Sequence, residues 1–157
     1  MKQIYVLQGP HDSGKTSTVR EIYNIINQKY PNATEMRIHK KNNAWDITYI
    51  LEIVDEEKGK IKIGINSGGD ALGCIYEPLN TFNSEGCDLI FCACSSTYGQ
   101  MTEFIDSFQK EYKTFYIHKL KNILNTNNLD RGKENSAQAQ ENQAIAEHIV
   151  NCAFTLL

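Results

Sequence analysis

The stretch YVLQGPHDSGKTSTV, residues 5–19, contains a change from strand-like to helix-like sequence. Residues 4–7 are an apolar run of β-forming residues that stops at Gly9-Pro10, as expected for a strand buried on both faces. Beyond Gly14 the apolar residues follow helical spacing, with one face made by Val19, Ile22, Tyr23, Ile26 and Tyr30. The stretch therefore predicts a buried strand, a glycine-rich loop and an amphipathic helix that Pro31 ends.

The loop itself, GPHDSGKT at residues 9–16, fits the pattern G-x-x-x-x-G-K-[ST]. Backbone N–H groups of a tight glycine-containing loop, together with the N-terminus of the following helix, suit a phosphate group. We expect Lys15 to reach the β- and γ-phosphates and the Thr16 hydroxyl to be a ligand of Mg²⁺. The predicted nucleotide-binding residues are Gly9, His11, Asp12, Ser13, Gly14, Lys15, Thr16 and Ser17.

Residues 1–30 resemble the first strand, Walker A loop and first helix of the P-loop NTPases. The motif is specific to that superfamily, and beyond residue 30 the resemblance is one of topology. It implies a nucleoside triphosphate ligand, Mg²⁺ and a carboxylate near the metal at the end of a strand. Asp70 follows IKIGINSGG and is the expected metal-supporting and, with Lys15, catalytic residue. The spacer Ser67-Gly68-Gly69 departs from the family pattern, and an ordinary turn aspartate is the alternative.

The remaining periodic segments predict alternating strands and helices. Expected strands are a short one near residues 36–38, a hairpin of 46–54 and 60–65, and two runs at 89–94 and 114–118. Helical faces cover residues 101–112 and 145–156, and a short helical segment near 72–82 is disturbed by Pro78. The order predicts a three-layer α/β fold, P-loop NTPase-like, with a mostly parallel sheet of about five strands and one antiparallel hairpin strand.

Composition places these elements in a single domain, residues 1–157, and residues 121–143, rich in Asn and Gln, are expected to form a mobile polar loop. The net charge of −3 disfavours a basic nucleic-acid binder. No long apolar run is present, and the N-terminus reaches Gly9-Pro10 too soon for a secretory segment, so we expect no membrane contact and a cytoplasmic location. The five cysteines are interpreted as small apolar residues of a reducing compartment.

Two observations bear on the nucleotide base. The D-x-x-G at residues 70–73, with Thr34 in the preceding region, resembles the switch elements of small regulatory GTPases. The guanine-reading N-K-x-D is missing, however, because residues 118–121 read HKLK and offer no carboxylate to the guanine N–H groups. The cofactors expected are therefore ATP and Mg²⁺, with a GTPase-like switch as the alternative.

The reaction expected is hydrolysis of ATP or transfer of its γ-phosphate to a small-molecule acceptor, as in an ATPase or kinase-like phosphotransferase. The chain holds few arginines (Arg20, Arg37 and Arg131), which disfavours a nucleoside monophosphate acceptor. Arg131 either belongs to a lid over the nucleotide or is an ordinary surface residue. The hydroxyls of residues 95–98 either orient the acceptor or cap a helix. A nucleotide binder without turnover is a further alternative.

Other carboxylates are expected to lie away from the phosphates. Asp88 precedes its strand, so it is interpreted as a strand-start residue. Asp55 and Glu56 belong to the predicted hairpin turn, and Glu52 has no assigned role.

Overall fold

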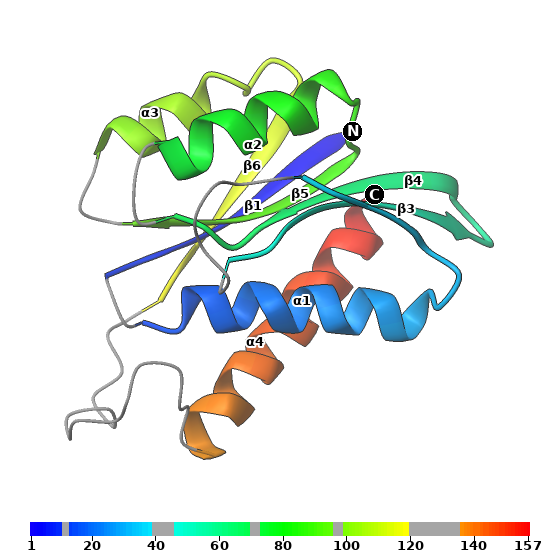
Figure 1. Cartoon of the computed structure of the whole chain (residues 1–157), viewed down its shortest axis with the longest axis horizontal. Coiled ribbons are helices and arrows are strands. Elements are labelled where there is room, and N and C mark those ends of the chain that lie inside the picture. Colours follow the sequence, from blue (N-terminus) through cyan, green and yellow to red (C-terminus); the bar gives the residue numbers. More distant parts are fainter. Residues whose placement is uncertain (11–12, 39–45, 70–72, 96–98, 120–135) are drawn as a thin grey trace.

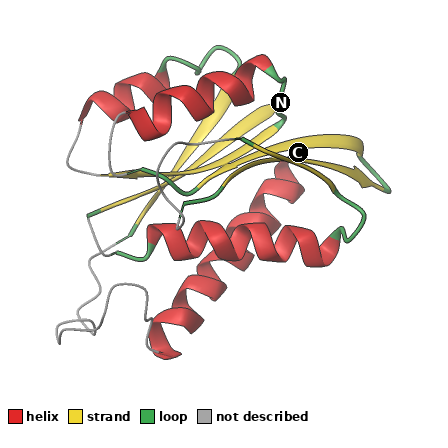
Figure 2. Cartoon of the chain, viewed as in Figure 1, coloured by secondary structure: helices red, strands yellow, loops and turns green. Residues whose placement is uncertain are grey.

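A computed structural model describes residues 1–10, 13–38, 46–69, 73–95, 99–119 and 136–157. In these segments six strands form one sheet and four helices pack on it (Figures 1 and 2). The strands are β1 (Lys2–Gly9), β2 (Thr34–Arg37), β3 (Thr48–Asp55), β4 (Gly59–Asn66), β5 (Leu89–Ser95) and β6 (Tyr112–His118). The helices are α1 (Lys15–Lys29), α2 (Gly73–Ser84), α3 (Gly99–Asp106) and α4 (Ser136–Leu156).

The strand order is β2-β3-β4-β5-β1-β6. Strand β1 is parallel to β5 and β6, β4 is parallel to β5, and β3 is antiparallel to both neighbours, β2 and β4. Strand β3 therefore runs against the other five, which confirms a mostly parallel sheet with one antiparallel hairpin strand. The expectation of about five strands was wrong, because all six expected strand segments join one sheet. The short strand expected near residues 36–38 is the edge strand β2, whose four residues are exposed.

Helices α1 and α4 cover one face of the sheet, and α2 and α3 cover the other (Figure 1). Alternate side chains of β1 point to opposite faces of the sheet and belong to two apolar layers. Tyr5 and Leu7 pack on the α1–α4 side, and Ile4 and Val6 pack on the α2–α3 side. All seven residues of β5 are buried. The arrangement is the expected three-layer α/β architecture, in which central strands read as continuous apolar runs.

The cysteines follow the same division. Cys87, Cys92 and Cys94 are fully buried in the α2–α3 layer, which confirms their interpretation as small core residues. Cys74 and Cys152 are half-buried, and all five thiols are free.

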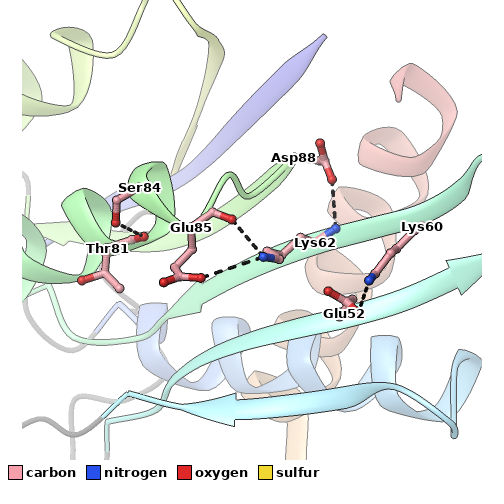
Figure 3. Close-up of polar contacts among 7 residues, drawn as sticks. All are labelled: Glu52, Lys60, Lys62, Thr81, Ser84, Glu85 and Asp88. Atoms are coloured by element: carbon pink, nitrogen blue, oxygen red, sulfur yellow. Dashed lines mark hydrogen bonds and ion pairs between the residues drawn. The ribbon is translucent and has the colours of Figure 1, made fainter.

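The charged side chains near the start of β5 form a structural network, drawn in Figure 3. Asp88 accepts a hydrogen bond from the Lys62 N–H at 2.9 Å, and its own N–H donates to the Lys62 carbonyl at 2.7 Å. Lys62 Nζ donates to the Glu85 carbonyl at 3.0 Å, and Lys60 pairs with Glu52 at 2.7 Å. The interpretation of Asp88 as a strand-start residue is confirmed, and Glu52 is engaged within the hairpin.

Helix α2 continues through Pro78. A proline cannot donate the helical hydrogen bond to the carbonyl four residues earlier, here that of Cys74. The Asn66 side chain donates to this carbonyl at 3.0 Å, and the last residue of β4 thereby supports the helix that follows it.

The expected mobile loop at 121–143 was partly wrong, because residues 136–143 belong to α4. Their alanines and long polar side chains favour helix, and two polar members, Gln138 and Asn142, are buried at 5% and 1% exposure. Residues 121–135 lie outside the described segments. None of the helices in the described segments is both long and apolar enough to cross a membrane.

Candidate functional site

The carboxyl ends of the parallel strands meet at one edge of the sheet, where ligands of open α/β sheets bind. Gly9 at the end of β1 is in register with Ser95 of β5, and Gln8 with His118 of β6. Because β3 is reversed, its first residue, Thr48, lies at this edge opposite Asn66 of β4. The edge also receives the N-terminus of α1, so the residues predicted to bind phosphate lie at its centre.

Two glycines delimit the loop between β1 and α1. Gly14 precedes the first residue of α1 and has φ 80° and ψ 21°, a left-handed conformation that favours glycine. A Cβ on Gly9 would lie 2.6 Å from the Lys119 carbonyl oxygen and 2.7 Å from Ser13 Oγ. Neither position has room for a side chain, so both glycines of the motif have a local structural reason.

Lys15 is folded back onto the loop. Its Nζ donates to the Gly9 carbonyl at 2.9 Å and to the Pro10 carbonyl at 2.8 Å, and the side chain is 6% exposed. These bonds hold the ammonium beside the backbone that precedes α1. An anion bound at the N-terminus of α1 could therefore contact both the Lys15 ammonium and the unpaired N–H groups of the first turn.

Ser13 supplies a test of whether the loop fits a phosphate. Its side chain is 3% exposed, and its Oγ has no hydrogen-bond partner among the residues that the structure describes. A buried hydroxyl without a partner is uncommon and calls for an explanation. A phosphate oxygen accepting this O–H would provide one, so the residues present fit a phosphate group. Ser17 is half-buried in the first turn of α1.

Thr16 contacts the segment that follows β4. Its Oγ1 lies 3.5 Å from the Ser67 carbonyl oxygen, at the long limit of a hydrogen bond. The Ser67 hydroxyl accepts from the Ile47 N–H at 2.8 Å and lies 3.3 Å from Asp46 Oδ1. Ser67 therefore contacts Thr16 through its carbonyl and Asp46 through its hydroxyl, and oxygens of these kinds are ligands that Mg²⁺ prefers.

A second buried lysine lies at the loop, directly after β6. Lys119 Nζ donates to the Gly14 carbonyl at 3.2 Å, to Thr18 Oγ1 at 2.7 Å and to Asn142 Oδ1 at 2.5 Å. Thr18 Oγ1 donates in turn to the Gly14 carbonyl at 2.7 Å. This group of Lys119, Thr18 and Asn142 connects β6, α1 and α4 to the second glycine of the loop.

Sequence reasoning missed five of these residues: Asp46, Ser67, Thr18, Lys119 and Asn142. Lys119 could have been found from its place at the carboxyl end of β6, and Asp46 from its place before a strand that runs backwards. Asn142 carries no local signal, because its role depends on the packing of α4 against α1.

A titratable group near Lys15 in the core is the thiol of Cys94. Burial raises the pKa of the Cys94 thiol to about 11, and the positive charge of Lys15 opposes that rise. Cys94 is therefore a neutral thiol at physiological pH, and it packs 3.7 Å from the sulfur of Met101. It acts as a core residue and not as a nucleophile.

Several predicted site residues lie outside the described segments: His11, Asp12, Asp70, residues 96–98 and Arg131. Their roles stay predictions. Thr34, the candidate switch residue, is paired with Glu52 and lines a cavity of about 1030 Å³ with Tyr30 and Asp55 at the opposite edge of the sheet. Thr34 is thus remote from the loop because α1 carries the chain across the sheet.

Comparison of the chain with protein-family models, with curated proteins and with solved structures finds no match.

Proposed function

We propose that the chain binds Mg-ATP at the loop of residues 9–16 and hydrolyses it or transfers its γ-phosphate to a small acceptor. The observation that carries the proposal is the position of Lys15, whose ammonium is held over the loop by the carbonyls of Gly9 and Pro10. The buried, unpartnered hydroxyl of Ser13 adds a donor at the same place. Together they provide a positive charge and hydrogen bonds that replace the water molecules a triphosphate loses when it binds.

Each group of the loop has a role in this proposal. The first N–H groups of α1 donate to phosphate oxygens, and the positive end of the helix dipole favours their charge. Lys15 binds the β- and γ-phosphates and stabilises the charge that develops during phosphoryl transfer. His11, Asp12 and Ser17 complete the proposed contacts around Gly9, Ser13 and Gly14.

A magnesium ion would supply further charge neutralisation between the phosphates. We propose that Thr16 binds it, with Asp70 as a supporting carboxylate. Asp46 is a second carboxylate toward the same ion, because Ser67 connects it to the region of Thr16.

The base is proposed to be adenine. Lys119 comes where a guanine-reading motif would follow β6, but its ammonium donates to Gly14, Thr18 and Asn142 instead of facing a base. With no carboxylate at residues 118–121, guanine has no acceptor there.

One observation favours a second candidate, a nucleotide binder or switch with little turnover. The last residue of β4 is Asn66, an amide, and its groups already bond Thr48 at 3.0 Å, the Gly68 carbonyl at 2.8 Å and the Cys74 carbonyl at 3.0 Å. A strand end that bears a structural amide in place of a carboxylate gives metal-assisted catalysis less support.

Titration with ATP and GTP, each with and without Mg²⁺, tests the proposal. We expect ATP to bind in the micromolar range or tighter, Mg²⁺ to improve binding, and GTP to bind more weakly. Absence of binding by either nucleotide would contradict the proposal, and tighter binding of GTP would contradict the base assignment. Release of phosphate over many turnovers, measured with and without candidate acceptors, separates the enzyme from the switch.

Replacing Asp46 by Asn should reduce the benefit that Mg²⁺ gives to ATP affinity by about 10-fold, which corresponds to roughly 1.4 kcal/mol. The affinity measured without Mg²⁺ should stay the same, since the phosphate contacts are untouched. The matched control is Glu56→Gln, an exposed carboxyl in the hairpin turn at the other edge. An unchanged magnesium effect would exclude Asp46 from the metal region.

A further inference from the structure

Lys119 contacts both glycines of the phosphate-binding loop. Its backbone lies against Gly9, where the Lys119 carbonyl oxygen is 2.6 Å from the position of a Cβ, and its N–H donates to the Gln8 carbonyl at 2.7 Å. Its ammonium reaches the carbonyl of Gly14 at the other end of the loop. One residue therefore defines the space available to the loop at both of its ends.

The ammonium is anchored from below by α4. Asn142 is 1% exposed, and its Oδ1 accepts from Lys119 Nζ at 2.5 Å. The same Oδ1 is 2.8 Å from the position of a Cβ on Gly14, and Lys119 Nζ is 3.1 Å from it. Because a buried ammonium and a buried amide are costly to leave without partners, this pair has few alternative arrangements.

Holding the Gly14 carbonyl has a consequence for the loop. That oxygen accepts from the Thr18 N–H at 3.0 Å, from Thr18 Oγ1 and from Lys119 Nζ. The peptide bond is planar and trans, so the N–H of Lys15 points opposite to the Gly14 carbonyl. Bonds that hold the oxygen toward α1 and α4 therefore aim the Lys15 N–H out of the helix N-terminus, toward the proposed phosphate position.

We infer that Lys119, anchored by Asn142, is a positioning residue of the phosphate-binding loop: it sets the direction of the Lys15 N–H before nucleotide arrives. This inference rests on the proposed function and adds α4 to the nucleotide site. It assigns no direct contact between Lys119 and the nucleotide.

The test uses the full chain with three substitutions: Lys119→Met, which keeps the aliphatic stem, Asn142→Leu, and Asn142→Asp, which keeps the acceptor oxygen. Lys113→Met is the control, because Lys113 is an exposed lysine of β6, the strand that Lys119 follows. Circular dichroism and thermal melting identify the folded variants. Mg-ATP affinity and amide hydrogen exchange over residues 13–19 are then measured for each.

We expect Lys119→Met and Asn142→Leu each to weaken Mg-ATP binding at least 10-fold and to speed exchange at the Thr18 amide, which donates to the Gly14 carbonyl. The double variant should be no weaker than the weaker single variant, because the two residues act as a unit. Asn142→Asp and the control should stay within threefold of the parent chain. If one of the two disrupting variants does not fold, the other is compared with Asn142→Asp and with the control, by affinity and by exchange.

Three results would overturn the inference: parental affinity in both singly disrupted variants, unchanged exchange at the Thr18 amide, or an Asn142→Asp variant as weak as Asn142→Leu. Failure of the proposed function can be distinguished from failure of this inference, because in the former case the parent chain itself would bind no nucleotide. The exchange measurement needs no ligand, so it tests the positioning of the loop even in that case.

Discussion

Replacement of Lys15 by Met is expected to weaken Mg-ATP binding by at least about 100-fold. The complex would lose the charge-assisted hydrogen bonds from the Lys15 ammonium to phosphate oxygens, each worth roughly 1.5–3 kcal/mol. A loss of about 1.4 kcal/mol lowers the affinity tenfold. The loop would also lose the two bonds from Lys15 Nζ to Gly9 and Pro10. Isothermal titration calorimetry of the two chains under identical magnesium conditions measures the effect.

The control for this experiment is Lys58→Met, which removes the same charge from an exposed residue at the hairpin turn. It should bind Mg-ATP as the parent does. Equal affinities for Lys15→Met and Lys58→Met would mean that the Lys15 ammonium is not at the phosphates.

Replacement of Gly14 by Ala is expected to have the largest effect on stability among the glycines with positive φ. A left-handed conformation costs an alanine roughly 1–2 kcal/mol, and overpacking typically adds about 1–3 kcal/mol. The new Cβ would lie 2.8 Å from Asn142 Oδ1, which cannot move away without losing its bond to Lys119. Urea unfolding should show a loss of about 3 kcal/mol, accompanied by weaker nucleotide binding.

Gly59 separates the two contributions. It has a φ of 75°, close to the 80° of Gly14, but a Cβ there would have no atom within 4 Å. Gly59→Ala should therefore cost only about 1 kcal/mol, the strain alone, and leave binding intact. Equal losses in the two variants would show that crowding at Asn142 contributes nothing.

The pattern of apolar residues predicted the strands and helices correctly where burial alone determines which residues are apolar. Strands β1 and β5, buried on both faces, appear as continuous apolar runs, and α1 shows its apolar stripe. The first half of α4 was missed, because Gln138 and Asn142 are buried polar residues and periodicity treats them as exposed. The buried side chain of Asn142 is hydrogen-bonded by Lys119 and Thr18, which are remote from it in the sequence.

The candidate site divides in a similar way. Gly9, Ser13, Gly14, Lys15 and Thr16 are predictable because a short loop and a helix N-terminus determine their geometry locally. Asp46 and Lys119 come to this end of the sheet only through its topology: Asp46 precedes the reversed strand and contacts Ser67, and Lys119 follows the edge strand β6 and contacts the loop. No pattern of spacing along the chain contains that information.

The reversal of β3 also has a practical consequence for experiments on this protein. Its eight residues span roughly 26 Å at about 3.3 Å per residue, so the turn after Asp55 lies on the order of 25 Å from the strand end that faces the loop. Glu56, Glu57 and Lys58 are exposed there. A fluorescent label on this turn would stand clear of the proposed nucleotide and still within energy-transfer range of a dye carried by it.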